Sequence, residues 1–400
     1  MRLPLLPMLI WMILNIGIDV YIYRVLSIRL KSHPFWKKFH LLLTIVLLID
    51  AIIAISLPLK SGDDATLIAV NWLLFTYITV YIPKYIFFIL DLISRIPAIF
   101  HFRRWKWLGR FGAALSIFLF FSFWWGTLIN RYQLEVKEVT VAIPHLPKSF
   151  EGYKIVQFSD FHVGSYNEDT SFVEKVVGVI NNLHPNAIFF TGDIVNRHST
   201  ELEPFVPTLK ELYAPDGVLA ILGNHDYGDY HYWRSPEEKR ENMALLYNMF
   251  EQAGWKLLRN ETYWLVRGND SIAVIGVENI GDPPFPVYGS LTKAYSNCED
   301  EKVKILLSHN PAHWEDSIAN HSEINIPLTL SGHTHAMQIE IAGLSPAALR
   351  YKKWGGLYVD EEGIHQLYVN IGLGTVGLPM RLGATPEITL ITLTGLSEEK

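Results

Sequence analysis

Acidic, amide and imidazole side chains follow five apolar runs in the second half of the chain. Each run is rich in β-branched or aromatic residues and is separated from the next by helical stretches, a pattern typical of an α/β domain. Because ligands collect at the carboxyl ends of strands in such sheets, we expect the five run ends to converge on one crevice. The runs are 154–159, 187–191, 218–222, 303–307 and 328–330, and they lead into the motifs D-F-H, G-D-I-V-N, G-N-H-D, S-H-N-P and S-G-H-T-H.

The spacing within these motifs is suited to holding metal ions. Asp160 and His162 stand two residues apart, as do His333 and His335, so each pair lies on one side of an extended strand end. Carboxylate, amide and imidazole groups form a nitrogen and oxygen ligand set, which suits manganese, iron or zinc. The single cysteine, Cys298, excludes a thiolate-rich cage. Two such ions that share a bridging carboxylate can clamp both oxygens of an in-line phosphoryl displacement.

Taken in this order, the motifs resemble those of the calcineurin-like metallophosphoesterase superfamily, over roughly residues 153–393. The resemblance implies an α/β fold, a four-layer αββα sandwich of two mixed sheets flanked by helices. It also implies two divalent or trivalent metal ions (manganese, iron or zinc) and hydrolysis of a phosphoester or pyrophosphate bond by a metal-bridging hydroxide. The ligands it implies are Asp160, His162 and His335 for the first metal, Asp193 as the bridge, and Asn224, His309 and His333 for the second.

The resemblance also implies a catalytic residue, His225, which lies beside the phosphate without binding metal. Many members of the superfamily carry aspartate where this chain has Asn196, and that aspartate pairs with the imidazole. A carboxylate would raise the pKa of His225, whereas an amide can only orient the ring. Asp226 would replace the missing charge only in part. We therefore expect Asn196 and Asp226 to support His225, with its general-acid strength reduced.

Two further residues are candidates for substrate contact. Tyr227 begins an aromatic cluster after the third motif, which either lines the substrate cleft or packs as an ordinary loop. Arg381 either reaches a phosphate or pairs with a surface acid. Histidines outside the motifs are more often surface or core residues than ligands. His313 is the nearest competitor to His309, but only His309 directly ends its apolar run.

The N-terminal part of the chain has the composition of a membrane region. Half of the 400 residues are apolar, and they gather before Arg131. A span takes about 20 apolar residues, and the stretches 5–26, 41–59, 67–90 and 111–129 qualify. Alternatively, residues 85–102 lie along the interface as an amphipathic helix. We predict a bundle of about four transmembrane helices in a region 1–130, a linker leading into the domain at 131–152, and the metallophosphoesterase domain at 153–400.

Charge predicts the side of the membrane and excludes one class of partner. Arginine and lysine crowd the loops after the first and third stretches, whereas residues 60–66 hold one lysine against Asp63 and Asp64. Basic loops are cytoplasmic, so we expect the catalytic domain on the outer side, periplasmic or extracellular. The formal net charge of -6 gives no general attraction for nucleic acid, which we do not expect to bind.

These observations predict a membrane-anchored hydrolase of a phosphorylated small molecule or lipid. Residues 341–358 mix large apolar with basic side chains, as in a segment that dips into the headgroup layer or in a loop packed on its own domain. One alternative is a non-catalytic membrane scaffold or sensor, which should have lost a ligand, and none is missing. A transporter would need more polar residues in its spans than Asn15, Asp19 and Asp50.

Overall fold

The computed structural model describes residues 5–57, 63–295, 302–319 and 321–396. Cys298 and the outer end of the second predicted stretch, at Leu59, lie outside these residues. The chain divides into two compact units, residues 1–128 with 377–380 and residues 129–376 with 381–400.

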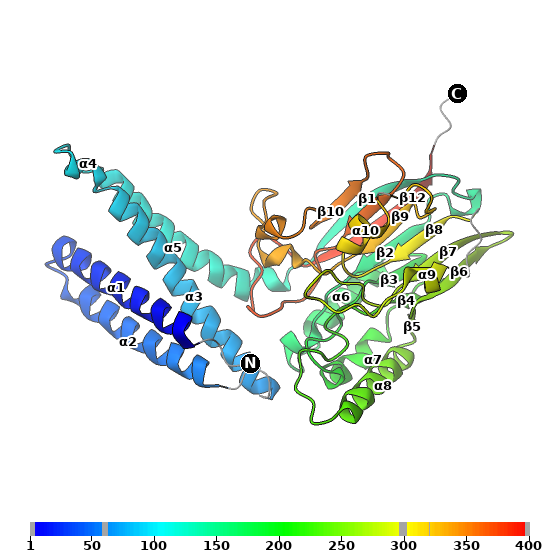
Figure 1. The fold of residues 1–400 in the computed structure, drawn as a ribbon, viewed down its shortest axis with the longest axis horizontal. Coiled ribbons are helices and arrows are strands. Elements are labelled where there is room, and N and C mark those ends of the chain that lie inside the picture. The colour runs from blue at the N-terminus through cyan, green and yellow to red at the C-terminus, as the bar shows by residue number, and fades with distance from the viewer. Residues whose placement is uncertain (1–4, 58–62, 296–301, 320, 397–400) are drawn as a thin grey trace. The chain divides into compact units, whose positions relative to one another are not determined.

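The first unit consists of long apolar helices, coloured blue to cyan in Figure 1. In the described part of the chain, four helices are long and apolar enough to cross a membrane, which confirms the predicted number and makes this a membrane protein. Residues 85–93 continue the third long helix through Pro83 and do not form a separate interfacial helix. The helices are α1 Leu5–Arg29, α2 Pro34–Ser56, α3 Asp64–Ile93, the short α4 Ile96–Ile99, and α5 Lys106–Leu128.

Polar side chains inside this unit bond to one another between helices. Lys84 Nζ on α3 lies 2.7 Å from Asp19 Oδ1 on α1, and Tyr81 donates to Asp19 Oδ2 at 2.8 Å. Asn15 Nδ2 donates to Tyr77 at 2.6 Å. An ionisable group among apolar helices is costly unless it is paired, so these bonds make Asn15 and Asp19 helix contacts.

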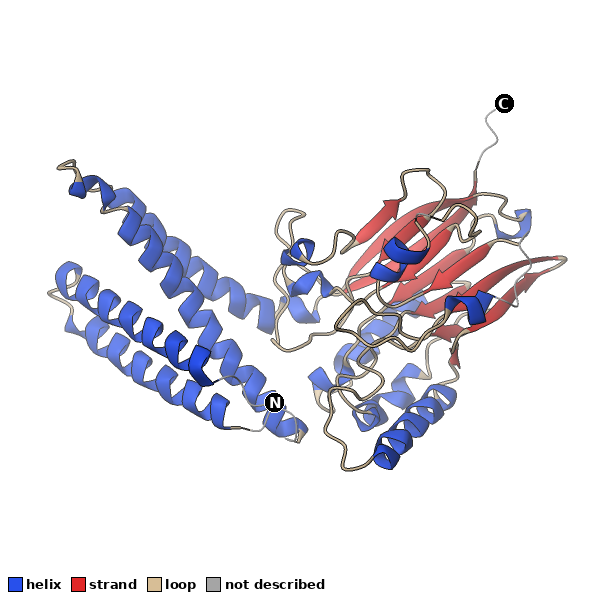
Figure 2. Ribbon diagram, viewed as in Figure 1, coloured by secondary structure: helices blue, strands red, loops and turns tan. Residues whose placement is uncertain are grey.

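The second unit is built on two six-stranded mixed sheets, drawn red in Figure 2. The first sheet has the order β1-β12-β2-β3-β4-β5, and the second has the order β10-β11-β9-β8-β7-β6. The strands of the first sheet are β1 Glu135–Ile143, β12 Glu387–Gly395, β2 Lys154–Phe158, β3 Ala187–Phe190, β4 Val218–Ala220 and β5 Lys256–Leu257. Those of the second are β10 Gly356–Val359, β11 Gln366–Val369, β9 Leu328–Ser331, β8 Lys304–Leu307, β7 Asp270–Gly276 and β6 Glu261–Arg267.

Side chains alternate along each strand and so divide the interior of this unit into three apolar layers. On β2, Ile155 packs between the two sheets, whereas Val156 and Phe158 pack against helices on the outer face. On the second sheet, Leu306 packs outward with Trp314 of the covering helices. These layers confirm the predicted four-layer αββα sandwich. The helices are α6 Ser171–Asn182, α7 Val206–Leu209 and α8 Pro236–Gln252 over the first sheet, and α9 Leu291–Tyr295 and α10 Ala312–Ser317 over the second.

The strands that carry the motifs run parallel, which brings their carboxyl ends to one edge. In the first sheet β2 pairs with β3, and β3 pairs with β4, all in parallel. In the second sheet β8 pairs in parallel with β9. Residues 131–152, expected to be a linker, hold β1, which pairs in parallel with β12 and contributes Val141 and Ile143 to the apolar layer between the sheets.

Candidate metal centre

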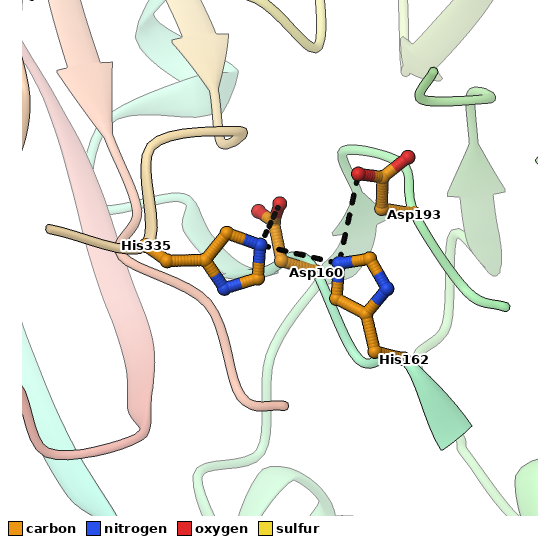
Figure 3. A group of neighbouring side chains, drawn as sticks. All are labelled: Asp160, His162, Asp193 and His335. Carbon is orange, nitrogen blue, oxygen red and sulfur yellow. Dashed lines mark hydrogen bonds and ion pairs between the residues drawn. The ribbon is translucent and has the colours of Figure 1, made fainter. Parts of the chain in front are cut away.

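One group of side chains gathers where β2, β3 and β9 end. Asp160, His162, Asp193 and His335 each offer one ligand atom, and these atoms lie within 4.8 Å of one another. His335 Nε2 lies 3.1 Å from Asp160 Oδ1 and 3.1 Å from His162 Nε2. Figure 3 shows the four side chains pointing toward one another, and all four are buried. This is the group that the resemblance assigns to the first metal together with the bridge.

A second group shares Asp193 with the first. Asp193, His309 and His333 also offer ligand atoms within 4.8 Å of one another. Asp193 Oδ2 lies 3.6 Å from His162 Nε2 in the first group and 3.2 Å from His309 Nε2 in the second. The other oxygen, Oδ1, accepts the backbone N–H of His225 at 2.8 Å. One carboxylate oxygen therefore faces both groups, as a bridging ligand requires.

The backbone at these positions is strained. Positive φ angles occur at Asp160 (50°), His162 (47°), Asp193 (62°), His333 (74°) and His335 (51°). Residues other than glycine rarely adopt this left-handed region, and each such residue costs on the order of 1–3 kcal/mol. Strain that is concentrated in one place and held by the surrounding structure marks a functional site.

A glycine makes room for this turn of the backbone. Gly372 has φ +79°, and a Cβ atom there would lie 2.6 Å from the Cβ atom of Asp160. Only glycine lets the chain pass so close behind a member of the first group.

Backbone carbonyls fix two of the imidazoles. His162 Nδ1 lies 3.1 Å from the carbonyl oxygen of Val195, and His309 Nδ1 lies 2.8 Å from that of Thr191. Because a carbonyl oxygen can only accept, Nδ1 carries a proton in both rings, and Nε2 is the nitrogen that faces the group. His333 has the reverse arrangement, with Nε2 at 2.9 Å from the Tyr351 hydroxyl and Nδ1 left for a ligand.

Burial and neighbouring charges shift the pKa values of the site's carboxylate and imidazoles. Burial opposes the charged form of Asp193, yet the imidazoles of His309 and His225 hold the pKa of this carboxyl well below its usual range. Burial also opposes the charge on His309, but the Asp193 carboxylate raises its pKa to about 9. Burial lowers the pKa of His333 to about 3, and the nearby charge of His309 adds to the effect. The site thus favours an ionised Asp193 carboxylate and a neutral His333 imidazole, the forms in which these groups bind metals, whereas the Asp193 charge favours a positive charge at His309.

Two buried atoms test whether metal ions fit. Asn224 Oδ1 has no hydrogen-bond partner among the described residues, and His309 Nε2 has only the Asp193 carboxylate, at 3.2 Å, although the other polar atoms of both side chains are bonded. Leaving a buried acceptor unpaired costs about 1–3 kcal/mol. A bound cation would remove that cost, and both residues belong to the set expected to bind the second metal. The residues present therefore fit two metal ions.

Asp226 acts differently from its expected role beside His225. Its carboxylate is fully buried and accepts backbone N–H groups from Asp193 (2.8 Å), Ile194 (2.8 Å), Val195 (3.3 Å) and Gly223 (2.8 Å). Burial and the neighbouring Asp193 carboxylate raise its pKa to about 7, whereas the amides favour the ionised form. Asp226 ties the loop after β3 to the loop after β4, and so positions the ligands.

His225 is oriented by the main chain of Asn196 and not by its amide. His225 Nδ1 lies 2.7 Å from the Asn196 carbonyl oxygen, whereas Asn196 Nδ2 donates to Ser165 Oγ at 3.1 Å. The His225 ring stacks on Tyr230 with centroids 4.2 Å apart and meets the edge of His162 at 4.8 Å. The ring is half-buried, so its Nε2 is available toward the open side of the site. The replacement of aspartate by Asn196 therefore leaves this orientation intact.

The two candidates for substrate contact are both buried, and Arg381 Nη2 lies behind the site, 3.4 Å from His335 Nδ1. Tyr227 is buried, stacks on Tyr288 with centroids 3.9 Å apart, and accepts the N–H of Asn279 at 3.1 Å. Arg381 is fully buried, and its guanidinium donates to three backbone carbonyls, at Gly374 (2.7 Å), Ala384 (3.1 Å) and Ile371 (3.0 Å). A guanidinium enclosed in this way holds loops together and cannot reach a phosphate. His313, the competitor of His309, bonds Ser308 at 2.8 Å and belongs to neither group.

Three aromatic residues contact the histidines of the site, and of these Phe285 is the one that the sequence did not indicate. Tyr230 stacks on His225, as described above, and its hydroxyl accepts from Asn224 Nδ2 at 2.9 Å. Tyr351 bonds His333, and the Phe285 ring meets the edge of His333 with centroids 4.7 Å apart. Tyr230 stands in the aromatic cluster, and Tyr351 stands in the mixed segment 341–358. No sequence signal pairs either with its histidine, because the partners meet only in the fold.

The sandwich fold and the paired histidine and aspartate groups define a metallophosphoesterase. Residues 153–337 match the calcineurin-like phosphoesterase family, which confirms the resemblance seen in the motifs. Residues 1–131 match a second family, described as the transmembrane domain of a probable calcineurin-like phosphoesterase. The chain belongs to the calcineurin-like metallophosphoesterases and carries a transmembrane domain before the phosphoesterase domain.

Its relatives include bacterial metallophosphoesterases and a vertebrate transmembrane protein with a metallophosphoesterase domain. The chain is 34% identical over 275 residues to the metallophosphoesterase YkuE of Bacillus subtilis, covering 66% of this chain and 87% of that one. It is 30% identical over 275 residues to the transmembrane protein with metallophosphoesterase domain of Danio rerio, covering 66% and 59%. It is 29% identical over 308 residues to the UDP-2,3-diacylglucosamine pyrophosphatase LpxG of Chlamydia trachomatis, covering 66% and 91%.

The bond from His225 to the Asn196 carbonyl predicts a contrast between two alanine variants. Asn196→Ala keeps the carbonyl, so turnover of a generic phosphodiester should fall less than ~10-fold, whereas His225→Ala should lower it ~100-fold or more. Metal content, measured by atomic emission, should stay unchanged in both. Equal losses in the two variants would mean that the Asn196 amide positions the histidine.

Proposed function

We propose that this protein hydrolyses a phosphoester or pyrophosphate bond with two metal ions held by the two groups. The observation that carries the proposal is the Asp193 carboxylate, whose Oδ2 lies 3.6 Å from His162 Nε2 in the first group and 3.2 Å from His309 Nε2 in the second. A scaffold that had given up catalysis would have no need to keep this set complete. Manganese, iron and zinc all suit the donors, which are nitrogen and oxygen atoms only.

In this proposal the chain's own residues bind and orient the phosphate. Two metal ions, when bound, neutralise phosphate charge and lower the pKa of water, which makes it a nucleophile near neutral pH. Asp160, His162 and His335 would hold the first ion, Asn224, His309 and His333 would hold the second, and Asp193 would be shared by both. His225 stands beside this set with Nε2 available to donate a hydrogen bond to the phosphate or to protonate the leaving oxygen.

Removal of the shared carboxylate tests the two-metal proposal. Asp193→Ala should lower both metal content and turnover, because both groups lose a ligand, while the fold survives as judged by circular dichroism. Asp229→Ala is the matched control, since this carboxylate is part-exposed and paired with Lys239 at 2.5 Å. If Asp193→Ala kept more than about a tenth of the wild-type rate, a loss of only about 1.4 kcal/mol, the assignment would be wrong.

A lipid-linked substrate is the finer part of the proposal, and an exposed apolar rim supports it. The rim consists of Ile341, Leu344 and Leu349, whose side chains are 60%, 76% and 94% exposed. Tyr351, two residues further on, bonds His333 of the second group. Arg350, between Leu349 and Tyr351, forms an ion pair with Asp282. Exposed apolar side chains of this size, next to a phosphate site, suit an acyl chain whose phosphate reaches the metals.

Chain connectivity and one relative point to the same class of substrate. Residues 129–134 are the only link between α5 and β1, and such a link spans at most ~20 Å. The catalytic unit is therefore tethered close to the membrane that α5 enters. The relative LpxG is named for a diacylated, pyrophosphate-linked compound, which combines acyl chains with a phosphoric anhydride.

A charge placed on the rim tests the lipid proposal. The double variant Leu344→Asp, Leu349→Asp should lose at least ~10-fold in turnover of a lipid pyrophosphate in mixed micelles, because two exposed apolar side chains no longer enter the lipid phase. Its turnover of a small soluble phosphodiester should stay near that of wild type. Trp354 is unsuitable for such a change because it packs on buried Ala336, Ile371 and Ala384.

A matched control separates capture of lipid from general damage. Val266→Asp places the same charge on another exposed apolar residue (62% exposed), on β6 at the opposite edge of the sheet from β10. This variant should keep full activity on both substrates. Equal losses on lipid and soluble substrates in the rim variant, or no loss on either, would leave a tethered phosphoesterase that acts on soluble compounds.

We also propose that the catalytic domain lies on the outer side of the membrane. Both basic loops belong to one end of the helical unit, because Arg29 from the first loop and Arg104 from the second contact the same residue, Asp91. An even number of spans with this end in the cytoplasm delivers the catalytic domain outside.

Protease added to intact cells tests this orientation. It should cut the catalytic domain, whereas an epitope inserted after Phe102, an exposed turn residue, should resist cleavage until the cells are opened. A periplasmic marker protein serves as the control for access. A protected catalytic domain together with an accessible epitope would reverse the orientation.

A further inference from the structure

Three arginines surround one buried carboxylate in the helical unit. Asp91, near the end of α3, has a fully buried side chain. Its Oδ1 accepts from Arg29 Nη2 at 2.5 Å and from Arg104 Nη2 at 2.5 Å, and its Oδ2 accepts from Arg95 Nη2 at 3.0 Å. The Tyr21 hydroxyl donates to the same Oδ2 at 2.6 Å. This Asp91 cluster joins the ends of α1 and α3 to the segment that precedes α5.

The charges in this cluster do not balance. Three guanidinium groups face one carboxylate, which leaves a surplus of two positive charges. The arginine side chains are 34% (Arg29), 39% (Arg95) and 26% (Arg104) exposed. Within the described part of the chain, none of their Nη1 groups has a hydrogen-bond partner. Arginine never loses its charge, so the surplus persists at every physiological pH.

The cluster stands at the ends of membrane-spanning helices, where lipid headgroups are expected. It is formed at the ends of the apolar helices, and large exposed aromatic residues flank it in the sequence, as in the aromatic belts of membrane proteins. A small residue keeps the cluster compact, since a Cβ atom on Gly109 would lie 2.7 Å from Asp91 Oδ1. The exposed aromatic residues are Trp36 (48%), Phe102 (71%), Trp105 (49%) and Trp107 (64%).

We propose that the Asp91 cluster binds the phosphate of an anionic phospholipid headgroup. Guanidinium groups recognise phosphate through paired N–H bonds, and Asp91 holds three of them in place before the lipid arrives. A phosphate brings the negative charge that the cluster lacks, and the exposed aromatic side chains contact the acyl region beside it. The site is independent of the metal centre, because every residue in it belongs to the helical unit.

Lipid titrations of the full chain in a neutral detergent test the proposal. Thermal unfolding is followed with added dioleoyl phosphatidylglycerol, dioleoyl phosphatidylcholine or inorganic phosphate. Wild type should be stabilised in a saturable manner by phosphatidylglycerol, and not by the other two at the same concentration. Arg104→Gln and Arg95→Gln should each weaken the apparent affinity for phosphatidylglycerol ~5-fold.

The neighbouring residue supplies a matched control. Arg103 is exposed and adjacent to Arg104, so Arg103→Gln makes the same change of charge outside the cluster. Its affinity for phosphatidylglycerol should equal that of wild type. If Arg104→Gln does not fold, Arg95→Gln decides, because Arg29 and Arg104 still pair with Asp91 in that variant.

Three results would overturn the proposal. Equal stabilisation by phosphatidylcholine would show that the cluster does not distinguish an anionic headgroup from a zwitterionic one. An equal loss in Arg103→Gln would show that the arginines act only as a diffuse basic surface. Competition by inorganic phosphate at the same concentration would make the cluster a site for free phosphate and not for lipid.

Discussion

The Asp226 carboxylate is the interaction on which the metal centre depends most. Its two oxygens accept four backbone amides from the loops after β3 and β4, which carry Asp193 and Asn224. These loops leave different strands, and without a shared acceptor each could turn independently. The Asp193 carboxylate then accepts the His225 amide, so the bridging residue and the adjacent histidine are fixed by one chain of bonds. A water-exposed acceptor could not do this as rigidly, because solvent would compete for the amides.

This tie also explains how the strained turns persist. Five members of the metal set have positive φ angles, a combined cost of several kcal/mol if each residue costs on the order of 1–3 kcal/mol. The amides bound by Asp226 and the carbonyls bound by Arg381 hold the turns from behind, where the sheets provide a rigid base. A metal ion then binds to side chains that are already aimed, so little ordering is lost on binding.

The sequence predicted the strands, the membrane helices and the expected metal ligands, but not the contacts that position those ligands. Strand ends could be predicted because short apolar runs with period two stop at polar motifs, and the helices because their apolar stretches match a bilayer. Arg381 and Tyr227 looked available to a substrate, yet both are buried, because burial depends on neighbours that the local sequence does not reveal. The link from Asn196 to His225 was missed because it uses a main-chain carbonyl, which every residue carries.

Two buried aspartates, Asp226 and Asp91, favour ligands of opposite charge, although both side chains are carboxylates. Asp226 accepts only neutral backbone amides, so no donor cancels its charge, and together with the neighbouring Asp193 carboxylate it favours cations. Asp91 is surrounded by three guanidiniums, so its charge is exceeded and the cluster favours an anion. In both cases the carboxylate orders the groups around it by accepting their hydrogen bonds. Whether the site favours a cation or an anion depends on whether those donors are neutral or charged. A buried aspartate is therefore best interpreted together with all of its donors.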